Sequence, residues 1–388
     1  MARIPPSALD VTDQIGDRVP GLAIAVTDAD QILSVETFGL ADIANNVPMT
    51  PDTVCNWFSM TKLVTATVAM QLAEDGRLDL DAPAAEYYKP ISKLRTSQAA
   101  PTITTRHLLS HSSGLANPMP MRWVHPPTEP GPDHSTFVAN VLGRSYRLRF
   151  EPGSRAAYSN LGYLVLGEII ETVAGCSYES CVTARVLEPL GMSATGFTAD
   201  PNRIWATPYQ RRRTKLNIAL PVLVPRWLLG PNTDRFRSLY HFYVDGASYG
   251  GLVGPVNDAA RFLRAHLADG TIDRSGNHPN DTPDKSADNG TGNSTDESTA
   301  VFTAETARAM RTIVADGKGF HAGLGWYRRG SGPVDGFVEH LGGGAGFWNC
   351  MRLHQRDGIG VVVMGNATSY NHEPIVAAAL KRALAQQE

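Results

Sequence analysis

The stretch formed by residues 55–73 constrains this chain most, because a polar, reactive segment leads directly into an apolar helical pattern. It contains the only Ser-x-x-Lys of the sequence, at Ser59 and Lys62. The apolar run of residues 63–73 predicts a helix buried on most sides. Residues three apart share one face of a helix, so we expect the Lys62 amine to reach the Ser59 hydroxyl.

This pair has the composition of an activated nucleophile. A serine hydroxyl is a weak nucleophile until a neighbouring base takes its proton, and lysine is a base only if its pKa falls well below about 10.4. Burial disfavours an ammonium ion, so the predicted helix supplies the cause of such a shift. We expect Ser59 in the first turn, where free backbone N–H groups favour negative charge. Alone the motif is weak, because about one Ser-x-x-Lys arises by chance in a chain of this size.

Two further polar residues precede a second predicted helix. Tyr158 and Asn160 form the only Tyr-x-Asn of the chain, just before an apolar run that Gly175 ends. The functional interpretation is a phenol that shares protons with Lys62 and an amide that holds Lys62 or a substrate. The alternative is a surface tyrosine and a helix-capping asparagine.

Three other segments are not assigned a catalytic role from the sequence. His107 and His111, in a short helix of residues 104–115, are interpreted as structural residues rather than catalytic ones. Residues 201–245 form either a lid or pocket wall or an ordinary packed insertion, and the arginines at 211–213 indicate a solvated face. Residues 271–299 are almost free of apolar side chains and predict a disordered insertion.

Composition excludes several classes of function. The chain has 388 residues, of which 42% are hydrophobic and 19% charged, and a net charge of −3, which is typical of a soluble globular protein. Near-neutrality gives no electrostatic reason to expect nucleic acid or an anionic membrane as a partner. The N-terminus lacks a signal-type apolar region and no stretch reaches about eighteen apolar residues, so we expect a cytoplasmic protein with no stable membrane insertion. The four cysteines lack zinc spacing and are interpreted as buried thiols, with no metal.

The strand signals lie near the two ends of the chain. Residues 21–27 form an apolar run and residues 32–38 alternate, as two antiparallel strands do. Residues 337–364 contain further strand patterns, and a helix over 374–385 closes the chain.

Three motifs in one order resemble the active-site elements of the serine β-lactamase and penicillin-binding-protein superfamily. They are Ser59-x-x-Lys62, Tyr158-x-Asn160 and His340-x-Gly342. The match is closest to the class C-like branch, which includes class C β-lactamases, D-alanyl-D-alanine carboxypeptidases, D-aminopeptidases and esterases. Connecting sequence such as residues 107–115 is similar to the family as well, and the resemblance covers roughly residues 10–385 apart from the insertion.

The resemblance implies an α/β fold of the α+β type. An antiparallel sheet would be made from the N- and C-terminal segments, residues 8–58 and 246–388, and flanked by helices. A mostly helical part, residues 59–245, would be inserted between them within a single catalytic domain of residues 8–388. The active site would lie in the cleft between the two parts.

The resemblance also implies a mechanism through an acyl-enzyme on Ser59. Lys62, hydrogen-bonded to Tyr158, would take the serine proton and pass it to the leaving group. The backbone N–H groups of Ser59 and Gly343 would hold the oxyanion. Water would then hydrolyse the ester, and the family needs no metal or organic cofactor.

The third motif departs from the Lys-Thr-Gly of many penicillin-recognising relatives. His340 gives a weaker, pH-dependent charge, and Leu341 removes a hydroxyl that could bind a substrate carboxylate. The leading hypothesis is therefore a carboxylic-ester hydrolase acting on a small molecule, with an apolar segment at 218–229 suited to an acyl or aryl group. The alternatives are a D-aminopeptidase or DD-carboxypeptidase-like amidase, a weak β-lactamase, or a non-catalytic scaffold.

Overall fold

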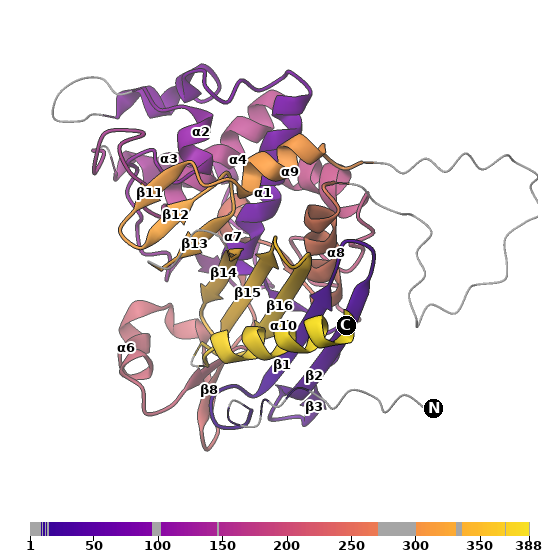
Figure 1. Ribbon diagram of the computed structural model, residues 1–388. Helices are drawn as coiled ribbons and strands as arrows, with labels where there is room; N and C mark the ends of the chain where they lie inside the picture. Colours follow the sequence, from indigo (N-terminus) through magenta and orange to yellow (C-terminus); the bar gives the residue numbers. More distant parts are fainter. Residues whose placement is uncertain are drawn as a thin grey trace, which may run out of the picture.

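A nine-stranded antiparallel sheet organises the molecule, with the order β11-β12-β13-β14-β15-β16-β1-β2-β3 (Figure 1). Its strands are β1 (Gly21–Thr27), β2 (Ile32–Asp42), β3 (Val47–Pro48), β11 (Ala315–Gly317), β12 (Phe320–Ala322), β13 (Tyr327–Arg329), β14 (Val338–Gly344), β15 (Phe347–His354) and β16 (Ile359–Gly365). The two ends of the chain meet where β1 pairs with β16, Leu22 opposite Gly365. The predicted fold class, a sheet built from N- and C-terminal segments, is confirmed.

The computed structural model describes residues 9–387 except 10, 12, 14, 95–101, 146, 271–299, 331–335 and 369. The insertion predicted to be disordered, 271–299, therefore lies outside the described residues. Within the described part, no helix combines the length and apolarity that a bilayer-spanning segment requires.

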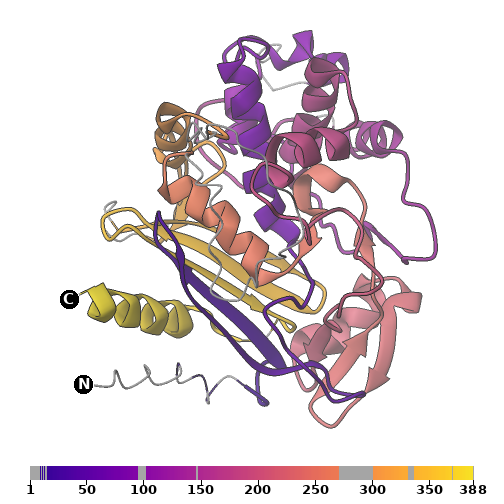
Figure 2. The same ribbon diagram turned by 90° about the vertical axis from the view of Figure 1, so that its right-hand side faces the viewer.

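Both faces of the central strands are covered, so β1 and β16 are buried at every position and almost entirely apolar. Alternate residues of a strand face opposite sides. Ile24 and Val363 belong to one apolar cluster, which includes residues of the C-terminal helix α10 (Glu373–Gln387), and Ala25 and Val362 belong to the other. The second cluster includes residues of helix α8 (Val256–Leu267), and Figure 2 shows α8 and α10 on opposite faces of the sheet.

A layer of helices packs beyond α8 (Figure 1). They are α1 (Thr61–Glu74), α2 (Thr105–Leu109), α3 (His134–Gly143), α4 (Asn160–Ala174), α5 (Tyr178–Val182), α7 (Ala247–Gly250) and α9 (Ala304–Arg311). Every residue of α1 from Thr61 to Leu72 is buried, with less than 9% of its surface exposed. The helix predicted over 63–73 is therefore confirmed as the buried axis of this layer. Ser159 caps α4 by accepting from the Gly162 N–H, and Gly175, with φ +72°, ends it as predicted.

The segment 201–245, counted with the helical part from the sequence, instead forms a lobe around a small sheet. Its strands are β6 (Tyr209–Arg211), β7 (Leu229–Asn232) and β8 (Phe236–Leu239), and it carries one helix, α6 (Lys215–Leu223). The lobe projects from the body beside the lower end of the sheet (Figures 1 and 2). Two more short strand pairs are present: β4 (Cys55–Asn56) with β10 (Val253–Gly254), and β5 (Val124–His125) with β9 (Tyr243–Val244). The 3₁₀ turns of the described residues lie at Phe58–Met60, Ala84–Glu86, Lys89–Lys93 and Arg226–Leu228, and a π turn lies at Thr183–Leu187.

Candidate active site

Ser59 lies on a 3₁₀ turn, η1 (Phe58–Met60), that leads into α1, and so precedes the first α-helical turn in which we expected it. Phe58 has a φ of +49°, a conformation that costs a bulky residue about 1–3 kcal/mol. Contacts with two rings hold Phe58 in place, with centroids 6.0 Å away in Phe242 and 6.2 Å away in Phe347. The turn presents the partly exposed Ser59 side chain to a cavity.

Lys62 reaches Ser59 as its spacing predicted. Its Nζ lies 3.0 Å from Ser59 Oγ and donates to the Tyr249 carbonyl at 2.7 Å. The side chain is fully buried, and burial lowers the pKa of Lys62 well below its ordinary value. The surroundings are aromatic, with the Tyr158 ring centroid 5.0 Å and the Tyr163 centroid 5.6 Å from Nζ. A neutral amine in this position can accept the proton of Ser59.

Tyr158 lies on the other side of Ser59, immediately before α4. Its hydroxyl shares a hydrogen bond with Ser59, and burial raises the pKa of the phenol. The phenol therefore stays protonated and able to donate. The structure thus brings Ser59, Lys62 and Tyr158 together.

Asn160 begins α4 and lines the same cavity as Ser59. Its backbone N–H donates to Asn117 Oδ1 at 3.0 Å, and its own buried Oδ1 has no partner among the described residues. The alternative interpretation of Asn160 as a helix cap is wrong, because Ser159 has that role. This amide oxygen can accept a hydrogen bond from a substrate, or from Lys62 if that side chain changes its conformation.

The third motif lies on β14, beside the nucleophile turn. Leu341 and Gly343 line the cavity, whereas His340 and Gly342 do not, since alternate residues face opposite sides of a strand. A Cβ on Gly342 would lie 2.1 Å from the Trp57 carbonyl oxygen, so only glycine allows this close approach of β14 to the turn.

His340 is fully buried behind the cavity wall. Its ring centroid is 6.2 Å from that of Tyr158, and its Nε2 has no partner among the described residues. Burial lowers the pKa of His340 well below its ordinary value. The imidazole is therefore neutral and offers no positive charge to a substrate carboxylate.

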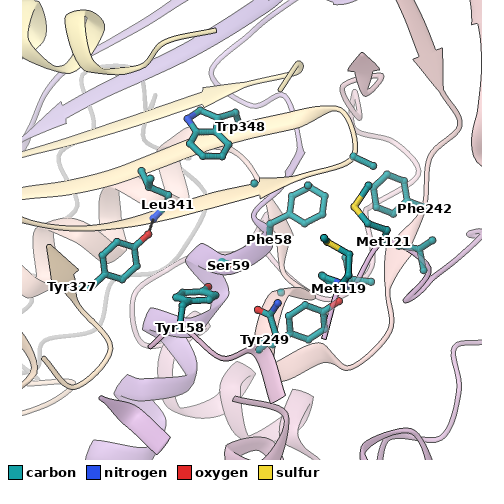
Figure 3. A pocket seen from close by; sticks show the side chains of 18 of the residues that line it. Phe58, Ser59, Met119, Met121, Tyr158, Phe242, Tyr249, Tyr327, Leu341 and Trp348 are labelled. Carbon is teal, nitrogen blue, oxygen red and sulfur yellow. Dashed lines mark hydrogen bonds between the residues drawn. The ribbon is translucent and has the colours of Figure 1, made fainter. Parts of the chain in front are cut away.

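The cavity at Ser59 has a volume of about 290 Å³ and mostly apolar walls (Figure 3). The apolar lining includes Phe58, Met119, Met121, Phe242, Val244, Leu341 and Trp348. None of residues 218–229 lines it, so this apolar segment does not form the acyl or aryl site that it would have offered had it bordered the cleft. Instead Phe242 and Val244, at the end of the 201–245 segment, form part of the wall. Arg329 on β13 is the single charged residue of the lining.

His111 is a contributor to the site that the sequence pattern did not reveal. It follows α2 with a φ of +54°, is buried, and its Nδ1 accepts the Ser159 N–H at 3.2 Å. The predicted structural role holds, but its partner is the segment before α4 rather than a helix C-terminus. His107 has a different role, because it closes a capping box with Thr104 at the start of α2. No local spacing relates His111 to that segment.

One group of side chains in the described part has the spacing of metal ligands. It consists of Glu339, Cys350 and His372, all buried, with ligand atoms within 4.8 Å of one another. Glu339 already pairs with Arg352 at 2.5 Å, and His372 Nδ1 accepts from Trp348. Burial raises the pKa of the Cys350 thiol, which opposes the thiolate that a metal needs. We assign no metal to these residues.

The four cysteines are free thiols, as predicted, although Cys176 is exposed rather than buried. Arg352 pairs with Glu339 and Glu373, and these three residues do not line the cavity at Ser59. The chemistry available at the cavity is therefore that of Ser59 and its neighbours.

A partly exposed serine in contact with a buried lysine, between an antiparallel sheet and a helical layer, defines a serine hydrolase of the β-lactamase and penicillin-binding-protein type. A family model described as Beta-lactamase matches residues 10–386, and the chain belongs to that family. The described part of the chain thus carries the family's fold and the three motifs predicted from the sequence.

Individual relatives differ in the activity that their names give. The D-alanyl-D-alanine-carboxypeptidase/endopeptidase AmpH of Escherichia coli is 26% identical over 93% of this chain and 84% of its own. Esterase EstB of Burkholderia gladioli is 32% identical over 53% of this chain and 55% of its own. The D-amino acid amidase of Ochrobactrum anthropi, a solved structure, has a TM-score of 0.72 at 22% identity over 97% of both chains, which is a likeness of fold.

Proposed function

We propose that this chain is a carboxylic-ester hydrolase that forms an acyl-enzyme on Ser59. The observation that carries the proposal is the 3.0 Å contact between Lys62 Nζ and Ser59 Oγ on the wall of an apolar cavity. Burial keeps the amine neutral and hence basic, and the apolar wall gives the acyl or aryl part of an ester a place to bind.

The proposed reaction begins with attack of Ser59 Oγ on the ester carbonyl carbon. Lys62 takes the hydroxyl proton. As the ester C–O bond breaks, Tyr158 gives its phenolic proton to the departing alkoxide and receives the proton held by Lys62, so that both side chains end the step neutral. The backbone N–H groups of Ser59 and Gly343 stabilise the oxyanion. Water then attacks the acyl-enzyme, with the same two side chains acting as base.

The remaining site residues have supporting roles in this scheme. Asn160 offers its unpaired Oδ1 to the substrate or to Lys62. Gly342 permits β14 to approach the nucleophile turn, which fixes the direction of the Gly343 N–H. The neutral His340 packs behind Tyr158 and brings no positive charge near Lys62.

Two features favour an ester over a β-lactam. A β-lactam antibiotic carries a carboxylate, yet the position that is lysine in many relatives is here a neutral, buried histidine, and Leu341 offers no hydroxyl. The relative EstB is named an esterase. An apolar cavity with few polar groups suits an uncharged ester.

The test compares wild type with Ser59→Ala on p-nitrophenyl butyrate, a chromogenic cephalosporin and D-alanine p-nitroanilide. We expect fast ester turnover that Ser59→Ala abolishes, with little cleavage of the other two. Undiminished ester hydrolysis by Ser59→Ala would contradict the mechanism. Absence of turnover on all three, with no labelling of Ser59 by a fluorophosphonate, would favour a non-catalytic scaffold.

A second candidate is an amidase or peptidase for D-amino-acid substrates. One observation favours it: Arg329, the single charged residue of the lining, can pair with a carboxylate at the cavity edge. The name of AmpH points the same way. Under this alternative, Arg329→Gln lowers cleavage of an N-acyl-D-alanyl-D-alanine peptide and leaves hydrolysis of the uncharged butyrate ester unchanged; equal effects on both substrates would exclude it.

A further inference from the structure

Exposed apolar side chains are concentrated on the lobe and its neighbouring loop. Among the described residues, the large apolar side chains of high exposure lie at Met119, Ile204, Leu216, Ile218, Val222, Trp227, Tyr240 and Val314. Six of these eight belong to the lobe, at residues 204–240, and Met119 belongs to the loop before β5. A gathering of this kind marks an interaction surface, because scattered apolar residues would be spread over the whole molecule.

Helix α6 presents part of this surface directly to solvent. Ile218 and Val222 are four residues apart, share a face of the helix and are 77% and 76% exposed. Leu220, on the opposite side of the helix, is buried in the core. Lys215 lies at the first position of this exposed helix face. The face is therefore apolar, with a basic residue at its N-terminal end.

The sequence on both sides of this helix is basic, and the lobe's Asp234 lies beyond it, where its backbone carbonyl accepts from Arg212 at 3.1 Å. Residues 201–233 contain no aspartate or glutamate. The basic residues adjacent to α6 are Arg211, Arg212, Arg213, Lys215 and Arg226. In the part of the chain that the structure describes, the ion pairs between side chains include none of these five. Apolar residues beside a basic cluster characterise helices that lie on anionic membranes.

This surface adjoins the candidate active site. The Arg122 guanidinium, on the loop before β5, donates to the Val222 carbonyl at 2.9 Å and joins that loop to α6. Met119 on the same loop is 74% exposed and also lines the cavity of Ser59, where Figure 3 shows it beside Tyr249. A partner of α6 would therefore lie close to the cavity.

We propose that α6 and the basic residues 211–215 dock this protein on the surface of an anionic lipid bilayer. Ile218, Val222 and Trp227 enter the headgroup boundary, and the arginines and Lys215 contact the anionic headgroups. Docking in this orientation places Met119 and the cavity beside the bilayer. A second copy of this chain fits the surface less well, because the two-fold contact would set one basic cluster against another.

The test is co-sedimentation of the full chain with phosphatidylcholine vesicles, with and without phosphatidylglycerol, at low and high salt. We expect binding only to the anionic vesicles, weakened by salt. Arg212→Gln/Arg213→Gln/Lys215→Gln should lower the partition coefficient on the order of a hundredfold, at about fivefold for each basic side chain. Ile218→Ser/Val222→Ser should lower it by at least about tenfold.

Matched controls separate docking from general effects of charge or stability. Lys89→Gln/Lys93→Gln/Lys318→Gln removes three exposed charges outside the lobe, and Val314→Ser removes an exposed apolar residue outside it. Both should bind like wild type. Ser59→Ala should also bind like wild type, so the result does not depend on hydrolysis.

Three outcomes would overturn the proposal. Equal weakening by the control triple would make binding a property of net charge alone. Concentration-dependent dimers that Ile218→Ser/Val222→Ser abolishes, without vesicle binding, would identify a second copy as the occupant. Binding to duplex DNA but not to vesicles would assign the basic cluster to nucleic acid.

Discussion

The imidazole of His111 stacks on the phenol ring of Tyr158, with ring centroids 4.4 Å apart and planes 29° from parallel. The same imidazole accepts the N–H of the next residue, Ser159, so it fixes both the ring and the backbone at this point. Because Tyr158 shares a hydrogen bond with Ser59, the position of His111 determines where the proposed proton donor lies.

Replacing His111 by Asn should lower kcat by about 10–100-fold with little change in KM, since a small displacement of Tyr158 impairs proton transfer more than binding. Asparagine tolerates the left-handed backbone that His111 adopts, so strain is not the cause. Steady-state kinetics on p-nitrophenyl butyrate measure the effect. His107→Asn is the control, because His107 caps its own helix, and its kcat should stay within about twofold of wild type. Equal losses in both variants would show that the effect is one of stability.

Removing the hydroxyl in Tyr158→Phe should lower kcat by about 10²–10⁴, the usual contribution of a general acid or base. The phenylalanine keeps the ring that packs against His111, so the melting temperature should change little. Single-turnover phosphonylation of Ser59 by a fluorophosphonate, which releases fluoride, measures the attack step separately. Full activity in Tyr158→Phe would assign proton transfer to Lys62 alone.

The buried Lys62 should make stability depend on pH. Because burial lowers the pKa of Lys62, the unfolded chain binds a proton that the native state does not, at pH values between the native pKa and about 10.4. The free energy of unfolding therefore rises with pH in this window. Lys62→Met removes the penalty, so the variant should melt above wild type, with a gap that widens as pH falls from about 10 and becomes constant below the native pKa.

Calorimetry of both proteins across that pH range measures the gap, and kcat should be lost in Lys62→Met at every pH. Lys89→Met, at an exposed lysine, is the control and should show no pH-dependent gap. A constant difference between Lys62→Met and wild type would mean that Lys62 is protonated in the native state.

Adding one methyl group at Gly342 should disrupt the site. Its Cβ would meet the Trp57 carbonyl oxygen at 2.1 Å, which forces β14 away from the nucleophile turn. We expect Gly342→Ala to lower kcat by about 10²–10³, the cost of a lost oxyanion donor. Gly143→Ala is the matched control, because a Cβ there meets no atom within 4 Å. If both variants keep wild-type kcat, the close approach of β14 has no part in catalysis.

Much of the fold followed from local pattern. The buried strand of residues 21–27, the apolar helix after Lys62 and the helix that Gly175 ends all lie where the sequence predicted them. Each depends on the periodicity or end signals of one segment. The contact between Ser59 and Lys62 belongs to the same class, because helical spacing alone sets it.

The small sheet of the 201–245 lobe could not be predicted in this way. Its strands are three or four residues long and five prolines lie in the segment, so the strand pairing is decided by contacts with the body. The residues of the cavity wall could not be predicted from local pattern either, since Met119 comes from an irregular loop and Arg329 from a three-residue strand.

The sequence by itself determined the buried helix, the serine–lysine pair that begins it and the order of the three motifs. Only the tertiary structure decided that His111 stacks on Tyr158, that Leu341 rather than His340 faces the cavity, and that a basic, apolar lobe adjoins it. The physical reason is the sequence separation over which the deciding interactions act. Helical and strand periodicity is set by residues within a few positions of one another, whereas the facing of a strand and the neighbours of a loop are set by packing between distant segments.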